Sequence, residues 1–291
     1  MGTPINWVDM HGRLLFASLA LAGASGCSAN VGASAELDAE ASAAAAAIVI
    51  ERVTGPDGTR SDAKARFVRG RAGPLTEDVL RFLALDEAPA PLGSCVRASG
   101  EVPSVPVGGL RLLDVGKVTL HADSTAAPFE LSKRRVPDVV DVVSGVIYGA
   151  SRLDVASRAP LEVRVAGEPE LGPVRVAIEA PGDVAGLRMD GHDSAHPVAA
   201  GSDVELTWEP SAEREPISVD VTAIDGEGRR STWRCGQLDT GHATVAAALL
   251  GDGDGIIAVR RSHRTTFRSA GIDKGELRVD FVRELPYTRR R

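Results

Sequence analysis

Alternating apolar and polar positions recur along the second half of this chain. Five runs follow a period of two and end near glycine, proline or acidic residues: residues 161–165, 174–178, 204–208, 217–221 and 277–281. In a β-strand, successive side chains point to opposite faces, so each run predicts a strand with one buried and one solvated face. Five such strands between turn-forming loops predict an antiparallel β-sandwich.

The first half carries similar but less regular signals. An apolar run at residues 46–54 leads into the turn sequence GPDG at 55–58, and residues 65–69 continue as a return strand. This combination predicts a β-hairpin. The short alternation at 118–120 predicts a further strand, and the β-branched stretch at 136–149 predicts a buried strand or strand pair.

Two stretches have helical rather than strand spacing. Residues 75–85 place Val79, Leu80 and Leu83 on one face of a short helix. Residues 243–252 predict a helical turn that connects two strands, and DGEG at 225–228 predicts a hairpin turn. The predicted fold is therefore mostly β, with antiparallel β-sandwich domains of the immunoglobulin-like or fibronectin III-like kind, two in number, and one or two short helices.

The front of the chain has the pattern of an export signal. Residues 14–24 form an apolar run after Arg13, too short to cross a bilayer and the right length for the apolar region of a secretory signal. Cys27 directly follows Ser25 and Gly26, and this stretch resembles a bacterial lipobox. The resemblance implies that the Cys27 thiol is acylated, as by palmitate, and becomes the mature N-terminus. A plain signal peptide with a coincidental cysteine, and a transmembrane anchor, are the alternatives.

These signals divide the chain into four predicted parts. Residues 1–26 are a lipoprotein signal peptide, and 27–47, small and polar, are a flexible tether. Residues 48–158 form an N-terminal β-rich domain, and 159–291 form a C-terminal β-sandwich domain. By resemblance to sorting rules in Gram-negative lipoproteins, Ser28 favours the outer membrane, where a lipid anchor would hold the protein.

The net charge and the cysteines indicate which kinds of partner and which redox compartment to expect. The 33 basic and 40 acidic residues give a formal net charge of −7, which does not suggest a nucleic-acid partner. Cys95 and Cys235 remain once Cys27 is set aside. In an oxidising compartment they form either a disulfide or two separately buried thiols. We favour separate thiols, because the two positions fall in different predicted domains.

Candidate chemistry is sparse. His192 and His196 have the H-x-x-x-H spacing of a zinc helix, but the glycine and proline around them favour a solvated loop. Asp252 and Asp254 suggest a calcium loop that lacks the oxygen donors expected at its fifth and twelfth positions. The sequence contains no G-x-S-x-G, Walker or G-x-G-x-x-G motif, so no hydrolase elbow or nucleotide site is expected. We expect no cofactor and no metal.

Basic residues cluster in two late segments of this acidic chain. Arg260, Arg261, His263 and Arg264 lie close together in the sequence, and the chain ends in YTRRR at 287–291. Arginine recognises phosphate groups, so a phosphate-rich surface such as lipopolysaccharide is one possible contact. Exposed strand ends and a ragged terminus are the alternative interpretation.

Several of these positions together resemble a known group of sequences. The motifs that carry the resemblance are residues 206–210 (LTWEP), Cys235, residues 239–241 (DTG), Val245, residues 249–250 (LL), residues 259–261 (VRR), and the stretch from 136 to 148. They are similar to uncharacterised lipoproteins of GC-rich Gram-negative bacteria. The resemblance covers about residues 90 to 285, implies β-sandwich domains and an envelope location, and carries no activity.

The preferred function is therefore a non-enzymatic module of the cell envelope that binds protein or glycan through loops. Two alternatives are kept. One is a metal-dependent hydrolase built from dispersed residues such as Asp190, His192 and His196; the other is a subunit of an envelope assembly that pairs through an exposed strand edge.

Overall fold

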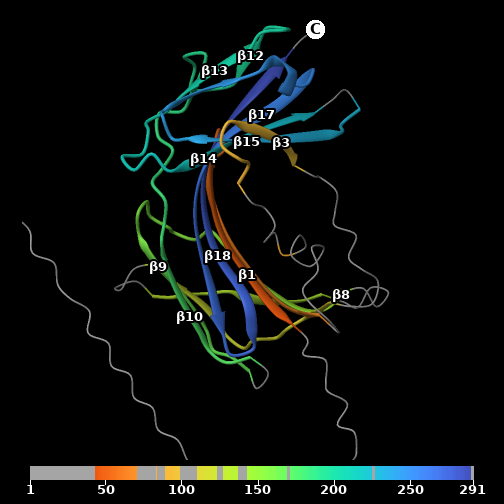
Figure 1. Ribbon diagram of the computed structural model, residues 1–291, viewed down its shortest axis with the longest axis vertical. Helices are drawn as coiled ribbons and strands as arrows, with labels where there is room; N and C mark the ends of the chain where they lie inside the picture. Colours follow the sequence, from red (N-terminus) through yellow and green to blue (C-terminus); the bar gives the residue numbers. More distant parts are fainter. Residues whose placement is uncertain are drawn as a thin grey trace, which may run out of the picture. The chain divides into compact units, whose positions relative to one another are not determined.

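The structure, a computed structural model, is mostly β (Figure 1). It describes residues 43–70, 83, 89–98, 110–122, 127–136, 143–168, 171–224 and 227–289. The described residues all belong to one compact unit. The predicted signal peptide and Cys27 lie outside the described residues, as does the helix predicted over 75–85 apart from Leu83.

A ten-stranded sheet dominates the fold. Its strands run in the order β15 (Arg230–Leu238), β14 (Pro216–Ile224), β17 (Gly253–Ser269), β18 (Ile272–Arg289), β1 (Ala44–Gly55), β2 (Gly58–Gly70), β4 (Leu110–Leu112), β8 (Val143–Ser151) and β7 (Ser132–Val136), and β12 (His196–Val198) also pairs with β18. Most neighbours are antiparallel, as predicted, but β1 and β12 are parallel to β18, and β4 is parallel to β8.

Two smaller sheets complete the described structure. Four strands form one of them, in the order β10 (Val174–Glu179), β9 (Pro160–Val165), β5 (Val118–His121) and β6 (Phe129–Glu130). Three strands form the other, in the order β11 (Arg188–Met189), β13 (Val204–Thr207) and β16 (His242–Val245). Strand β3 (Ser94–Ala98) lies beside β15, and a 3-10 turn at Ala247–Leu249 connects β16 to β17. The helical turn predicted over 243–252 is thus limited to these three residues, because residues 243–245 belong to β16.

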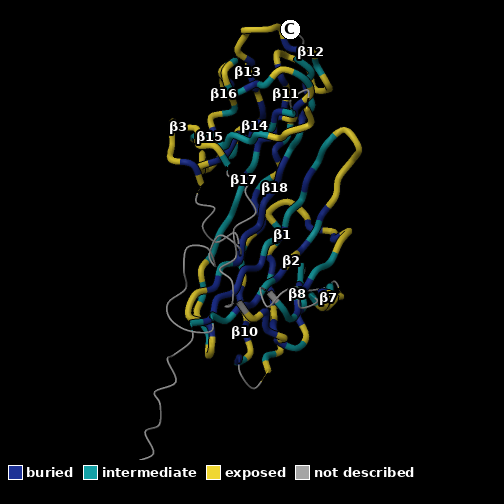
Figure 2. The backbone as a smooth tube through the Cα atoms, turned by 90° about the vertical axis from the view of Figure 1, so that its right-hand side faces the viewer, coloured by how far each residue is buried: buried dark blue, intermediate teal, exposed yellow. Residues whose placement is uncertain are grey.

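The smaller sheets pack on one face of the large sheet and enclose two apolar cores. The first core joins β1, β2, β8 and part of β18 to the four-stranded sheet, with Phe67, Val163 and Phe281 among its members. The second joins β14, β17 and the rest of β18 to the three-stranded sheet, around residues such as Leu206 and Tyr287. Figure 2 shows buried stretches in dark blue along β18, which contributes residues to each core. Strand β18 therefore belongs to both cores.

This arrangement differs from the predicted domain boundary at 158. The first core extends through Ala180 and the second begins at Val184, so β9 and β10 belong with the N-terminal strands. Strand β1 pairs with β18 over ten positions, from Ala45–Lys274 to Thr54–Arg283. Strand β1 also begins at Ala44, within the segment predicted as tether. A pairing between the two ends of the chain cannot be read from local periodicity, which says only that a strand exists.

The five alternating runs of the second half each correspond to a strand, but their predicted solvated faces are only partly confirmed. Strands β9, β10 and β13 alternate between buried and more exposed positions as expected. In β14 and β18 the polar positions are buried as well: Asp220 is 7 % exposed and Asp280 1 %. The prediction of a wet face is wrong for these two central strands, because ion pairs satisfy the charges there.

Candidate functional site

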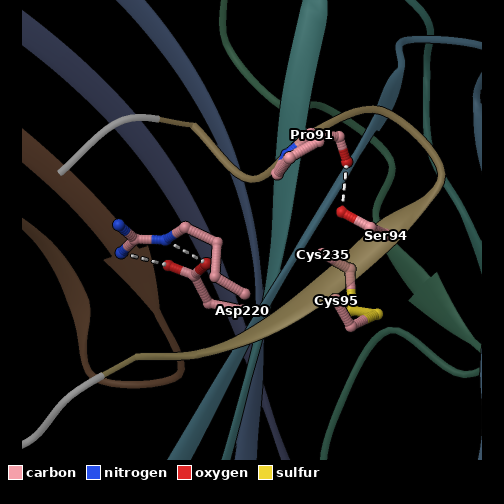
Figure 3. Close-up of a disulfide and its surroundings, with 6 residues drawn as sticks. Pro91, Ser94, Cys95, Asp220 and Cys235 are labelled. Atoms are coloured by element: carbon pink, nitrogen blue, oxygen red, sulfur yellow. Dashed lines mark hydrogen bonds and ion pairs between the residues drawn. A yellow bond between two sulfur atoms is a disulfide. The ribbon is translucent and has the colours of Figure 1, made fainter.

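Cys95 and Cys235 form a disulfide that ties β3 to β15 (Figure 3). The backbone approaches closely here: Gly93 N–H donates to Gly236 O at 2.8 Å, and Ser94 Oγ donates to Pro91 O at 2.8 Å. A Cβ at Gly236 would overlap the carbonyl of Ala90, so glycine permits this approach. The preference for separate thiols was wrong because it assumed that the two cysteines belong to independent domains.

One cluster of buried charges lies on the outer face of the ten-stranded sheet, which we define as the face opposite the two cores. Arg260 Nη1 is 2.9 Å from Glu51 Oε1 and 3.0 Å from Asp280 Oδ2, while its Nε is 3.4 Å from Asp220 Oδ2. Arg234 forms a two-bond contact with the same Asp220 carboxylate, at 2.8 and 3.1 Å. Each carboxylate of this cluster therefore faces a guanidinium.

The electrostatics of this cluster are those of a permanent ion network. Burial alone would lower the pKa of Arg260, but the carboxylates of Asp280, Asp220 and Glu51 outweigh it and raise that pKa above its ordinary value. Ser262 Oγ adds a hydrogen bond to Asp280 Oδ1 at 2.6 Å. The cluster therefore links five adjacent strands, β15, β14, β17, β18 and β1, through paired charges.

A second polar set lies between the two cores. The buried carboxylate of Asp239 accepts hydrogen bonds from Trp208 Nε1 at 2.7 Å and from Arg261 Nε at 2.8 Å. Arg261 also donates to Glu209 O at 2.6 Å and to the carbonyl of Asp183. His263, two positions on, has its ring nitrogens 2.8 Å from Glu179 O and 2.9 Å from Glu215 Oε2. Arg261 of β17 is thus tied to the loops that follow β10, β13 and β15.

The arginines proposed to contact a phosphate-rich surface are thus engaged inside the protein. The side chains of Arg260 and Arg261 are 17 % and 9 % exposed, and both make ion pairs. Arg264 lies 3.6 Å from Glu276, and Arg289 donates to Ala247 O at 2.8 Å. Arg260 and Arg261 therefore do not form an anion-binding surface, and they do not lie at exposed strand ends either. Residues 290 and 291 lie outside the described part of the chain.

The candidate metal-ligating residues do not assemble into a cation site. His192 lies in a turn and His196 opens β12; their rings stack 3.8 Å apart. The Asp190 carboxylate accepts the backbone N–H of Glu205 at 2.9 Å, and Asp254 accepts Thr288 Oγ1 at 2.8 Å. Across the described ranges, no three His, Cys, Asp or Glu side chains are placed to hold a metal ion.

Comparison with known proteins adds no relative. No protein-family model matches the chain, and no curated protein matches its sequence. Within the described residues, the structure has no helix that is both apolar enough and long enough to span a bilayer. The assignment of the chain to a lipoprotein family therefore stays a prediction.

Proposed function

We propose that this protein is a lipid-anchored, non-catalytic module of a bacterial cell envelope, held at the outer membrane through Cys27. The observation that best supports this function is the Cys95–Cys235 disulfide. Disulfides form and persist in oxidising compartments outside the cytoplasm, and the front of the chain has the pattern of an export signal. Both features agree with a protein that folds after export.

The arrangement of polar groups supports a binding or structural role. The buried charges on the outer face and between the cores are paired with each other, and such pairing serves architecture more readily than chemistry. We further propose that the second core is an immunoglobulin-like or fibronectin-like sandwich, since a three-stranded sheet faces β14, β17 and β18 there. The expected partners are the membrane, through the anchor, and an envelope protein or glycan.

Metabolic labelling tests the anchor. Cells that express the full chain are supplied with radiolabelled palmitate, and the label is expected in the wild-type protein but not in a Cys27→Ser variant. Ser25→Ala is the matched control, because it keeps a small residue at that position and leaves the thiol in place. The wild type and the control should sediment with membranes, and Cys27→Ser should not. Equal labelling and equal sedimentation of wild type and Cys27→Ser would refute the proposal.

A further inference from the structure

Three neighbouring strands at the β7 edge of the large sheet bring basic side chains to its outer face. In register, Lys64 of β2 faces Gly149 of β8, which faces Ser132 of β7. Two residues along, Arg66 faces Ile147, which faces Arg134. Side chains of directly paired residues lie on the same face of a sheet. The two rows therefore place Lys64, Arg66 and Arg134 around a common area.

This area is concave. A cavity of about 500 Å³ is lined by Lys64, Arg66, Ser132, Arg134, Gly149 and Ser151, together with Asp62 and neighbouring residues of the same strands. Its size lies within the range of small-molecule sites, about 300–1,000 Å³. Gly149 leaves the centre of the row without a side chain: a Cβ there would meet nothing closer than Ala63 O at 3.6 Å. We call this depression the basic notch.

The charge of the basic notch is opposite to that of the whole chain. Three cationic side chains and one carboxylate, Asp62, line it, whereas the protein has a formal net charge of −7. Lys64 and Arg134 are exposed, and within the described part of the structure neither has an ion-pair partner. This distinguishes them from Arg260 and Arg261, whose charges are compensated by buried carboxylates.

The groups around the basic notch match the needs of a phosphate. A guanidinium presents a planar fork to two phosphate oxygens, an ammonium adds a compact charge, and the hydroxyls of Ser132 and Ser151 are further donors. Arg66 is half-buried and already has an interaction of its own, so the binding argument depends on Lys64 and Arg134. A neutral ligand would leave the exposed charges of Lys64 and Arg134 uncompensated.

We propose that the basic notch binds a phosphate monoester carried by a small ligand or a headgroup, with Lys64 and Arg134 as its main charged contacts. The proposal goes beyond the proposed function and rests on it only in taking the protein to be a binding module; it requires no lipid on Cys27. The two claims therefore fail separately: loss of palmitate labelling leaves the notch untouched, and loss of phosphate binding leaves the anchor untouched.

Titration of the full-length protein tests the proposal. The probes are inorganic phosphate and a phosphorylated monosaccharide, followed by calorimetry and by the rise in melting temperature that a ligand of the folded state produces. Binding is expected to weaken as salt is added, because the contacts are charged and exposed. A Lys64→Gln/Arg134→Gln variant is expected to bind the phosphorylated sugar at least tenfold more weakly.

The matched control is Lys117→Gln/Arg175→Gln, which removes the same charge from exposed positions near and on the four-stranded sheet. It should bind as the wild type does, and circular dichroism should show that both variants fold. The proposal is overturned if neither probe binds at millimolar concentration, or if both double variants lose affinity equally, since that would show only a response to net charge.

Vesicles that contain phosphatidic acid distinguish the source of the phosphate. If the wild type binds them, the notch variant does not, and the phosphorylated sugar competes, the basic notch takes a lipid headgroup. Binding of the soluble sugar alone assigns it to a free ligand. Vesicle binding that is retained by the notch variant, without binding of either soluble probe, would place the anion contact elsewhere and contradict the proposal.

Discussion

At the scale of single residues, the polar groups that matter most are held by several partners at once. Asp114 is an example at the edge of the first core: its Oδ1 accepts from Lys133 Nζ at 2.6 Å, Tyr148 OH at 2.9 Å and Gly116 N at 3.0 Å. The buried Tyr148 hydroxyl in turn accepts Val115 N–H at 2.7 Å. An exposed carboxylate thus completes the hydrogen bonding of a core tyrosine.

Asp114 makes part of the stability dependent on pH. Its hydrogen bond from Lys133, assisted by those from Tyr148 and Gly116, lowers the pKa of Asp114 in the folded protein and outweighs the opposing effect of burial. A lowered folded pKa means that the unfolded chain binds the proton first as pH falls. The stabilisation by Asp114 is therefore complete at pH values above 3.8, the ordinary pKa of aspartate. It is lost as the pH falls through the lower pKa of Asp114 in the folded protein.

We expect Asp114→Asn to lower the free energy of unfolding at pH 7 by about 0.5–1 kcal/mol, the discounted size of an exposed ion pair. Urea unfolding from about pH 7 to pH 2.5 should show that the variant and the wild type converge at acid pH. Asp193→Asn, in an exposed loop, is the control and should follow the wild-type profile. A gap between Asp114→Asn and wild type that stays constant down to pH 2.5 would contradict this prediction.

At the scale of elements, β3 depends on a covalent link. It lies beside β15, with Leu92 bridging Gly236 and the disulfide joining residues 140 positions apart. Leu92 and Val96 are 55 % and 42 % exposed, so apolar burial contributes little to holding this segment. The disulfide therefore provides much of the free energy that keeps β3 beside β15, because it restricts the unfolded chain.

Removal of the disulfide should destabilise the protein strongly. The chain-entropy model gives a loss of up to about 5 kcal/mol for a loop of this length, and strain or residual structure reduces that figure. We expect the urea midpoint to fall on reduction of the wild type and to be equally low, with or without reductant, in Cys95→Ser/Cys235→Ser. A wild-type midpoint that does not respond to reductant, while thiol alkylation confirms that the bond has opened, would contradict this.

At the scale of the whole described structure, the two cores are built on one sheet. Strand β18 contributes Leu277, Val279 and Phe281 to the first core and Leu285 and Tyr287 to the second. The buried pair Arg261–Asp239 and the ion pair Arg52–Asp183, 2.9 Å apart, add polar contacts between them. Loss of either core would expose half of a shared strand, so we expect the cores to unfold together.

Two optical signals test this cooperativity. Trp208 and Trp233 lie in or against the second core, so in a Trp7→Phe variant their fluorescence reports that core, while far-ultraviolet circular dichroism reports all strands. We expect the two transitions to coincide in urea, as they do for a two-state unit. A fluorescence midpoint that differs from the dichroism midpoint would show two independent domains instead.

The boundary predicted from the sequence provides the complementary experiment. A fragment of residues 159–291 retains β18 but lacks β1, which pairs with β18 over ten positions and carries Ile48 and Ile50 of the first core. We expect this fragment to aggregate or to lose its cooperative transition, because an unpaired apolar strand edge is exposed. A soluble fragment that unfolds with the full-chain fluorescence midpoint would contradict the shared-sheet interpretation.

The sequence by itself determined where several of the strands lie and where the first hairpin turns. Alternation at 161–165 or 204–208 and the GPDG turn at 55–58 are local properties, because side chains alternate across a strand whatever it pairs with. Only the tertiary structure decided that β1 lies beside β18, that Asp220 and Asp280 are buried, that Cys95 reaches Cys235, and that Lys64 and Arg134 share a depression. These features depend on pairing between residues far apart in the chain, and periodicity within one strand carries no information about its neighbour.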